Sequence, residues 1–293
     1  KKLFYLIPTF VNLSLREIVT CLFYFNKNNY ILKSQFLSLK DIFYSINFVS
    51  RVDKIKINEI FFKKLNIKSL ILRELYLRRN LGASIIGLQN YLFAKNLKVK
   101  NIELKSVLNW NENSIVDKGW NYGFRSFYKG IKTFGYQGFF VEKKLSSIDI
   151  TTNEFKAKTC PEYLLIVGSI IRKSRSEFVK KIKFIQSRAF RFEHLFFKKF
   201  YKKKKNNKII ILLNLDKETC VEIIEKIKKT TFAKNKNTIY IKEHPLLKLS
   251  QFYHKQLPEN FKLISGDFYN IIKKIKVIVV SGSSSSVYES LLS

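Results

Sequence analysis

The chain has 293 residues, and 46% of them are apolar, which is enough for a substantial core and favours two domains over one. No apolar stretch is long enough to cross a membrane, and the three cysteines have neither metal-binding nor disulfide-framework spacing, so we expect a cytoplasmic protein. The formal net charge of +33 admits three interpretations: a compositional bias toward lysine, attraction to an anionic membrane face, and binding of nucleic acid.

The first half of the chain is predicted to be an α/β domain over residues 1–155. Hydrophobic periodicity predicts two helices and two strands in it. They cover residues 69–97, 101–110, 114–130 and 131–141. The stretch from 145 to 162 is polar and lacks periodicity, so we place the domain boundary there.

The second half, residues 156–293, alternates strands with helices, which predicts a parallel sheet with right-handed crossovers. Strands are predicted at residues 163–169, 208–215, 238–245, 261–265 and 277–280. A helix is predicted to begin after Asp216, and two more at residues 246–257 and 268–275. The predicted fold class is therefore α/β throughout.

The last predicted strand runs directly into a cluster of serines, which is followed by a helical pattern bearing Glu289. The cluster comprises Ser281, Gly282, Ser283, Ser284, Ser285 and Ser286. Parallel sheets bind ligands at the carboxyl ends of their strands, and the free N–H groups at a helix start attract anions. We predict a phosphate site here, with Gly282 allowing close approach and Glu289 accepting hydrogen bonds from a ribose. The alternative is that one serine caps the helix, the others have no role, and Glu289 is an exposed helix residue.

His244 lies at the carboxyl end of the strand predicted at residues 238–245, which Pro245 ends. This position places it at the same edge of the sheet as the serine cluster. An imidazole there is suited to bind a phosphate or to support a leaving group. The alternative is a strand-end histidine without a chemical role.

Two strand ends in the first half carry further candidates. The strand predicted at residues 101–110 ends in the segment from Trp110 to Asn113. Glu112 in this segment is the best candidate for a general base. The second strand ends in two glycines, which permit close approach of a ligand. The candidate substrate-binding residues are Asn113, Gly135, Tyr136, Gln137 and Gly138. Ordinary turns with a capping asparagine explain both patterns equally well.

Several catalytic signatures are absent from the sequence. There is no Asp-x-Asp pattern, no zinc-ligand spacing, no Gly-x-Gly-x-x-Gly and no Gly-x-Ser-x-Gly. No Gly-Lys-Ser/Thr follows the serine cluster, so it is not a P-loop. These absences give a hydrolase little support and predict a site that holds no metal.

The order of several short segments carries a family resemblance. They are Leu72-Arg73-Glu74, Gly82-Ala83-Ser84, WNEN (110–113), DKGWNYGFRSFY (117–128), GYQGFF (135–140), CPEYLLIVG (160–168), KEHP (242–245) and SGSSSSVYESLL (281–292). Residues 65–293 thereby resemble bacterial surface-carbohydrate biosynthesis proteins, the glycosyltransferase-like enzymes of lipopolysaccharide O-antigen and capsule clusters. The His-Pro and serine motifs are also similar to those of GT-B sialyltransferases, Kdo transferases and CDP-glycerol glycerophosphotransferases. Residues 1–64 have no counterpart in this resemblance.

The resemblance implies two Rossmann-like domains facing each other across a cleft, the GT-B arrangement. It implies that His244 and the serines from Ser283 to Ser286 contact the phosphate of a nucleotide-activated sugar, CMP- or UDP-linked. The first domain would present a growing surface polysaccharide or lipid-linked glycan, and Glu112 would deprotonate its hydroxyl. The helix terminus, the serines and His244 would stabilise the charge of the donor without a metal or a further cofactor.

The function expected from the sequence is therefore metal-independent glycosyl transfer by a cytoplasmic protein, peripheral at the anionic inner face of the membrane. The alternatives are a CDP-glycerol-type glycerophosphotransferase, a non-catalytic nucleotide- or glycan-binding subunit and, on charge alone, a nucleic-acid-binding protein. A complete translated chain begins with methionine, and this chain contains none, so we expect its true N-terminus to be missing. GT-B enzymes continue beyond the glutamate-bearing helix, whereas this chain ends at Ser293. We therefore expect a fragment that is truncated in its C-terminal domain and inactive by itself.

Overall fold

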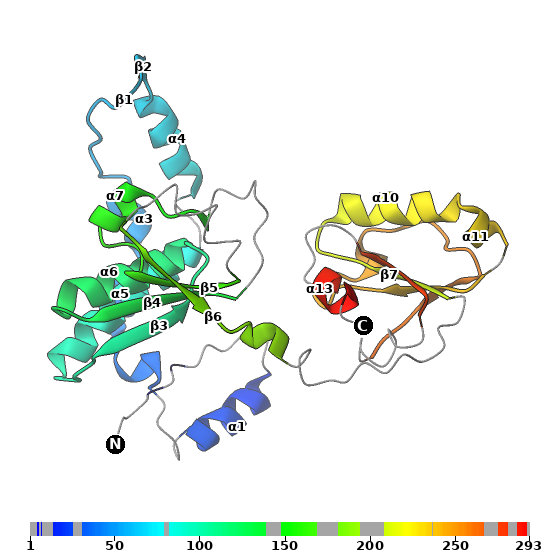
Figure 1. Cartoon of the computed structure of the whole chain (residues 1–293). Coiled ribbons are helices and arrows are strands. Elements are labelled where there is room, and N and C mark those ends of the chain that lie inside the picture. The colour runs from blue at the N-terminus through cyan, green and yellow to red at the C-terminus, as the bar shows by residue number, and fades with distance from the viewer. Residues whose placement is uncertain are drawn as a thin grey trace. The chain divides into compact units, whose positions relative to one another are not determined.

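The computed structural model describes residues 5, 7, 14–25, 31–78, 82–138, 148–168, 181–193, 208–235, 237–266, 275–280 and 286–291. These residues contain two four-stranded parallel sheets with helices between their strands, which confirms the α/β class (Figure 1). The chain forms two compact units, and the main part of the second begins at Arg188. The boundary predicted between residues 155 and 156 therefore lies inside the first unit.

The sheet of the first unit has four parallel strands in sequential order. They are β3 (Ser106–Trp110), β4 (Lys132–Gln137), β5 (Tyr163–Val167) and β6 (Lys183–Ser187). The prediction that β5 opens the second domain is wrong, because Leu165 pairs with Tyr136 of β4 and the rings of Tyr163 and Phe134 stack 4.8 Å apart. The polar stretch that suggested a linker contains α7 (Thr152–Lys156), which lies in the crossover from β4 to β5.

Two helices of the first unit pack against each other beside this sheet. They are α5 (Gly82–Val99) and α6 (Ile115–Phe127). Phe93 and Leu97 of α5 and Phe124 of α6 are almost fully buried, and Val107 of β3 packs against them. The predicted helix at 114–130 is therefore confirmed as α6, and its apolar stripe covers the sheet.

Glycines bring α5 and α6 unusually close together. A methyl group added to Gly119 of α6 would overlap the carbonyl oxygen of Gly87 of α5. One turn further along, a methyl group on Gly123 would come within 2.9 Å of the Cβ of Ala94. The two backbones thus lie in contact at positions where no side chain intervenes.

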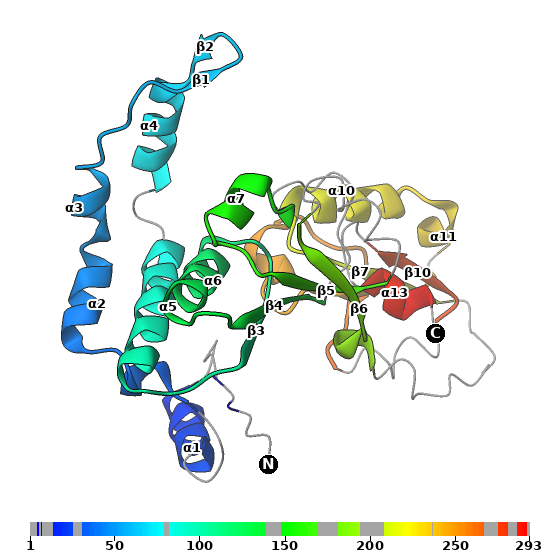
Figure 2. The same cartoon turned by 60° about the vertical axis from the view of Figure 1, so that its left-hand side comes forward.

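The residues before α5 form short elements that the sequence analysis leaves unassigned, except for the last. They are α1 (Leu15–Phe25), η1 (Lys33–Gln35), α2 (Leu39–Ile46), α3 (Phe48–Val52), the antiparallel pair β1 (Phe61–Phe62) and β2 (Leu65–Asn66), and α4 (Lys68–Arg78). The helix predicted at 69–97 is thus two helices, α4 and α5. α2 packs on α5, whereas α3, the hairpin and α4 extend away from the sheet (Figure 2). We call residues 48–78 the N-terminal arm.

The second unit contains the strands predicted from the alternating pattern. They are β7 (Ile209–Leu212), β8 (Ile239–Lys242), β9 (Phe261–Leu263) and β10 (Val277–Val280), in the order β10-β7-β8-β9. The helices described in this unit are α10 (Lys217–Lys228), α11 (Thr231–Lys234) and α13 (Ser286–Leu291). Ile211 and Ile241 are fully buried against Cys220 and Ile224 of α10. Read from the other edge, the strand order is that of the first four strands of the doubly wound nucleotide-binding fold.

The helix predicted at residues 246–257 is wrong, because only the single turn η4 (Leu249–Gln251) is helical there. A β-bridge between His244 and Leu247 reverses the chain first, and the carboxylate of Glu243 then accepts the N–H of Leu249 at 2.6 Å. The helix predicted at 268–275 lies outside the described residues except for Ile275. No helix in the described ranges is long and apolar enough to cross a membrane.

We expect Gly119→Ala to destabilise the first unit, because its methyl group must push α6 away from α5. Overpacking of this kind costs about 1–3 kcal/mol. The matched control is Gly82→Ala at the start of α5, where an added methyl group meets open space and should change the free energy of unfolding by less than about 0.5 kcal/mol. Urea unfolding of both variants measures the difference. Equal stability of the two variants would show that the helices do not cross at these glycines.

Candidate functional site

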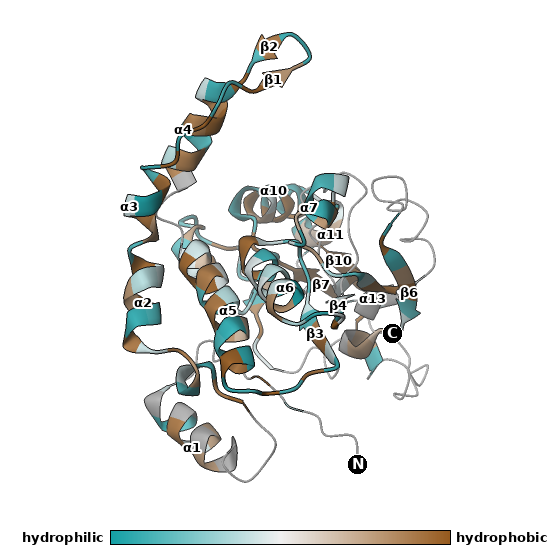
Figure 3. Cartoon of the chain, turned by 90° about the vertical axis from the view of Figure 1, so that its left-hand side faces the viewer, coloured by the Kyte–Doolittle hydropathy of each residue, from teal (hydrophilic) through white to brown (hydrophobic). Residues whose placement is uncertain are grey.

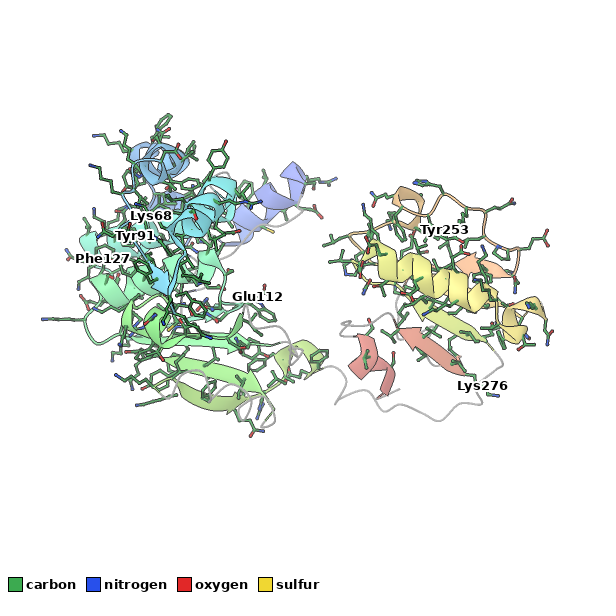
Figure 4. The ribbon with its side chains drawn as sticks, turned by 90° about the horizontal axis from the view of Figure 1, so that it is seen from above. Lys68, Tyr91, Glu112, Phe127, Tyr253 and Lys276 are labelled. Atoms are coloured by element: carbon green, nitrogen blue, oxygen red, sulfur yellow. The ribbon has the colours of Figure 1, made fainter. Side chains whose placement is uncertain are left out.

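β3 and β4 end side by side, and their ends carry the residues predicted for the acceptor side. Trp110 pairs with Tyr136, and the backbone N–H of Asn111 donates to the carbonyl of Tyr136 at 2.9 Å. Glu112, which is labelled in Figure 4, therefore follows β3 at the sheet edge where Gln137 ends β4. The structure thus brings both predicted segments of the first unit together.

Asp117 fixes the loop that carries Glu112, although the sequence-based candidates do not include it. Its Oδ2 accepts the N–H of Glu112 at 2.9 Å, the N–H of Ser114 at 3.0 Å and the hydroxyl of Ser114 at 2.9 Å. Its Oδ1 accepts the side-chain N–H of Asn109 at 3.1 Å. The carboxylate is buried and has four donors. The signal in the sequence is Ser-x-x-Asp at the start of a predicted helix.

Glu112 is exposed at this edge, and its carboxylate is held in place by a neighbouring ring. Its Oε1 accepts the indole N–H of Trp110 at 2.8 Å, and Trp110 packs edge-on against Tyr136 with ring centroids 5.6 Å apart. The group is therefore oriented and open to solvent. In this arrangement a carboxylate can accept the proton of a bound hydroxyl.

The five predicted substrate-binding residues beside Glu112 differ from it in burial. Asn113, Gly135, Tyr136, Gln137 and Gly138 are all buried. Asn113 has a left-handed backbone with φ of 57°, and its amide donates to the carbonyl of Asp149 at 3.3 Å and the carboxylate of Glu154 at 3.4 Å. Its side chain thus ties the loop to α7.

Asn111 is a buried amide that the sequence-based candidates also omit. It is 1% exposed, and neither its side-chain oxygen nor its nitrogen has a hydrogen-bond partner among the described residues. It packs across Gly135, where an added Cβ would come within 2.9 Å of Asn111 and 2.7 Å of Pro161. Gly135 therefore contributes the space that these two side chains occupy. Buried amides of this kind ordinarily bind water or a polar ligand group.

His244 follows β8 at the carboxyl edge of the second sheet, as predicted. Its Nδ1 accepts the backbone N–H of Leu246 at 3.2 Å, so the neutral ring carries its proton on Nε2. Burial lowers the pKa of His244 from its ordinary value of 6.5. At neutral pH the ring is therefore uncharged, with Nε2–H as its one strong donor.

The serine cluster can be placed only in part. Ser281, Gly282, Ser283, Ser284 and Ser285 lie outside the described residues, as does the side chain of Glu289. Ser286 is the first residue of α13, and its carbonyl accepts the hydroxyl of Ser290 at 2.6 Å. β10, which leads into the cluster, and β8, which leads to His244, lie on either side of β7. Neighbouring strands are about 4.8 Å apart, so these two strand ends are separated by roughly 10 Å at the same edge.

The first unit also contains a groove of about 520 Å³ between α3, α5 and α6, which sequence reasoning missed. Its walls are mainly apolar. They include Phe48, Val52, Ile55, Leu88, Tyr91 and Ile115. Arg51 and Lys118 also line the groove, and Lys118 is paired with Glu154 at 2.7 Å. No sequence signal identifies this groove, because the residues of α3 carry no assigned pattern.

Within the described ranges, no three His, Cys, Asp or Glu side chains are grouped so as to hold a metal ion. Burial raises the pKa of the Cys160 thiol to about 12, so the thiol is protonated at neutral pH and is a poor nucleophile. The two predicted catalytic groups, the carboxylate of Glu112 and the imidazole of His244, both lie within the described ranges. Comparison with known protein families, with curated proteins and with solved structures finds no match for this chain.

We expect His244 to titrate below 6.5, because burial disfavours its charged form. A lowered pKa in the folded state means that protonation favours unfolding, so its contribution to stability is present above pH 6.5 and is lost as the pH falls toward the folded pKa. NMR titration of the imidazole signals measures the pKa, and His244→Gln identifies which signal belongs to His244. A pKa of 6.5 or higher in the folded protein would contradict this environment.

Proposed function

We propose that the chain is a glycosyltransferase that moves a sugar from a nucleotide-activated donor to a growing surface polysaccharide or lipid-linked glycan, without a metal. The observation that carries the proposal is the strand order of the second unit. Between β7 and β10 the order reverses, and parallel α/β sheets bind their ligands outside the carboxyl ends of the strands at such a point. The chain leaves β10 at this point through the serine cluster.

The carboxyl end of β7, the neighbour of β10, is less suited to a phosphate than the serine cluster is. After β7, Asp216 caps α10 and accepts the N–H of Glu218 at 3.2 Å. Hydrogen bonding from Thr219 lowers the pKa of Asp216, so its carboxylate is ionised at neutral pH. A phosphate would meet a like charge at α10, whereas the residues from Ser281 to Ser286 contain only hydroxyls and one glycine. The donor phosphate is therefore assigned to the end of β10.

The remaining groups have the following roles in the proposal. The Nε2–H of His244 donates to the donor phosphate from the end of β8, and Glu289 accepts the ribose hydroxyls. Glu112 removes the proton of the acceptor hydroxyl in the first unit. The proposal includes the GT-B class of fold, with one Rossmann-like domain for the donor and one for the acceptor. The donor is CMP- or UDP-linked, and a CDP-glycerol donor would use the same phosphate contacts.

A non-catalytic nucleotide- or glycan-binding subunit is the second candidate function. It is favoured by the burial of the five predicted substrate-binding residues around Glu112. A first unit that exposes a single predicted acceptor-side group has little surface with which to orient a sugar hydroxyl. This candidate retains donor binding by the second unit and excludes transfer.

Thermal unfolding with CMP, CDP, UDP, GDP and a short oligonucleotide tests the proposal. A nucleotide at about 100 times its Kd stabilises the folded state by about 2.7 kcal/mol, which is roughly 5 °C for a chain of this size. We expect one nucleotide to give this shift and Ser284→Ala/Ser285→Ala to abolish it. Glu112→Gln, the control in the other unit, should keep the shift, and in the full-length protein it should lose sugar transfer.

Three results would contradict the proposal. One is a nucleotide response that the double serine variant retains. Another is the absence of any nucleotide response. The third is a response to the oligonucleotide alone that disappears with salt, which would show that the net charge serves nucleic-acid binding. A nucleotide response is expected of the binding subunit as well, and sugar transfer measured on the full-length protein separates the two candidates.

A further inference from the structure

The N-terminal arm, residues 48–78, exposes many large apolar side chains, and exposed apolar side chains that gather in one region mark an interaction site. At its hairpin, Phe61, Phe62 and Leu65 are 59%, 61% and 69% exposed. Along α4, Leu70, Leu72 and Leu77 are also exposed. Figure 3 shows hydrophobic residues along this helix. The exposed apolar residues of the arm are Ile55, Ile60, Phe61, Phe62, Leu65, Leu70, Leu72, Tyr76 and Leu77.

Positive charge is interleaved with this apolar surface. Residues 48–78 contain eight basic and three acidic side chains. Lys63 and Lys64 form the turn between β1 and β2, and both are exposed. Lys63 has a left-handed φ of 55°, a conformation that a glycine or asparagine adopts at lower cost. The hairpin therefore presents two ammonium groups at its tip, directly between exposed apolar side chains.

The apolar surface continues from the arm into the groove of the first unit. Ile55 is exposed on the arm and also lines the groove between α3, α5 and α6. Phe48 and Val52, at the base of the arm, line it as well. The base of the arm thus contributes apolar side chains to the groove, and its hairpin exposes further apolar side chains.

We infer that the N-terminal arm docks the first unit on an anionic lipid bilayer. Phe61, Phe62 and Leu65 enter the boundary between headgroups and acyl chains, and Lys63 and Lys64 contact the lipid phosphates. Apolar insertion and lysine contacts act together at such interfaces. The binding that we infer uses exposed side chains of the arm and is peripheral. This inference does not rest on the proposed transferase activity.

A lipid surface fits these side chains better than nucleic acid does. Single-stranded nucleic acid stacks on aromatic rings and pairs its phosphates with cations. Most of the exposed apolar side chains of the arm are leucine and isoleucine, which offer no stacking face. Aliphatic side chains gain most from leaving water for an apolar medium, and the acyl region of a bilayer provides one.

Vesicle flotation of the full chain tests the inference. We expect the protein to float with vesicles of equal parts phosphatidylcholine and phosphatidylglycerol and not with pure phosphatidylcholine. Phe61→Ser/Phe62→Ser should weaken the partitioning at least about tenfold. Lys63→Gln/Lys64→Gln should weaken it about tenfold and reduce its salt dependence.

The second unit offers matched controls for both changes. Leu215→Ser/Leu246→Ser removes two apolar side chains of similar exposure, and Lys226→Gln/Lys229→Gln removes two exposed lysines. Both controls should float like the wild type. All variants change exposed side chains, so their thermal unfolding should match the wild type.

The following outcomes would overturn the inference. The first is flotation that the arm variants retain or that the control variants lose equally. The second is a wild-type chain that does not float but self-associates through the arm, as shown by light scattering that Phe61→Ser/Phe62→Ser reduces to the monomer. The third is oligonucleotide binding that depends on Lys63 and Lys64 while vesicle binding is absent.

Discussion

The contact between Gly87 and Gly119 is the constraint on which the first unit depends. Because neither residue has a side chain, α5 and α6 approach until their backbones touch, and this fixes the position of the helix pair on the sheet. The start of α6 places Asp117, whose buried carboxylate in turn holds the backbone of Glu112. α2 packs on α5 and thereby positions the base of the N-terminal arm. One close helix contact thus determines where the exposed carboxylate and the apolar groove lie.

In the second unit, the strand order determines which residues lie at the candidate site. β7 lies inside the sheet, and the chain returns past it to form β10 on its other side. This path brings the carboxyl ends of β10, β7 and β8 to one edge, where His244 and the residues after Val280 follow. Asp216 already caps α10 with a negative charge, which makes the hydroxyl-rich end of β10 the better place for an anion. The proposed chemistry therefore follows from topology and local charge together.

Much of this fold could be predicted from the sequence. Alternating apolar runs indicate the four strands of the second unit, and Asp216 and Ser114 mark two helix starts through their capping side chains. Long-range pairing could not be predicted, so β5 was assigned to the wrong unit. β6 gives no strong signal, because most of its side chains are exposed. The apolar pattern at 246–257 predicts a helix, but the bridge between His244 and Leu247 and the hydrogen bond that Leu249 donates to Glu243 override it.

The candidate site was predictable to a smaller extent. Strand ends followed by polar residues correctly indicated where Glu112 and His244 lie. The burial of Asn113 and Gly135 could not be predicted, because their neighbours are distant in sequence. Asn113 contacts Asp149, and Gly135 contacts Asn111 and Pro161. The N-terminal arm had no recognisable pattern because its apolar side chains do not alternate with the period of a buried helix or strand. The exposure of these apolar side chains could therefore be seen only in the folded structure.

The most direct test of the central claim is NMR mapping of backbone amide shifts as CMP, CDP or UDP is added to the full chain. The account predicts that one of these nucleotides shifts the amides from Leu213 to Thr219, those next to His244 and those from Ser281 to Ser286. These segments follow the carboxyl ends of β7, β8 and β10. Shifts confined to the first unit, or no specific shifts with any of the three nucleotides, would contradict a donor site at this edge of the sheet.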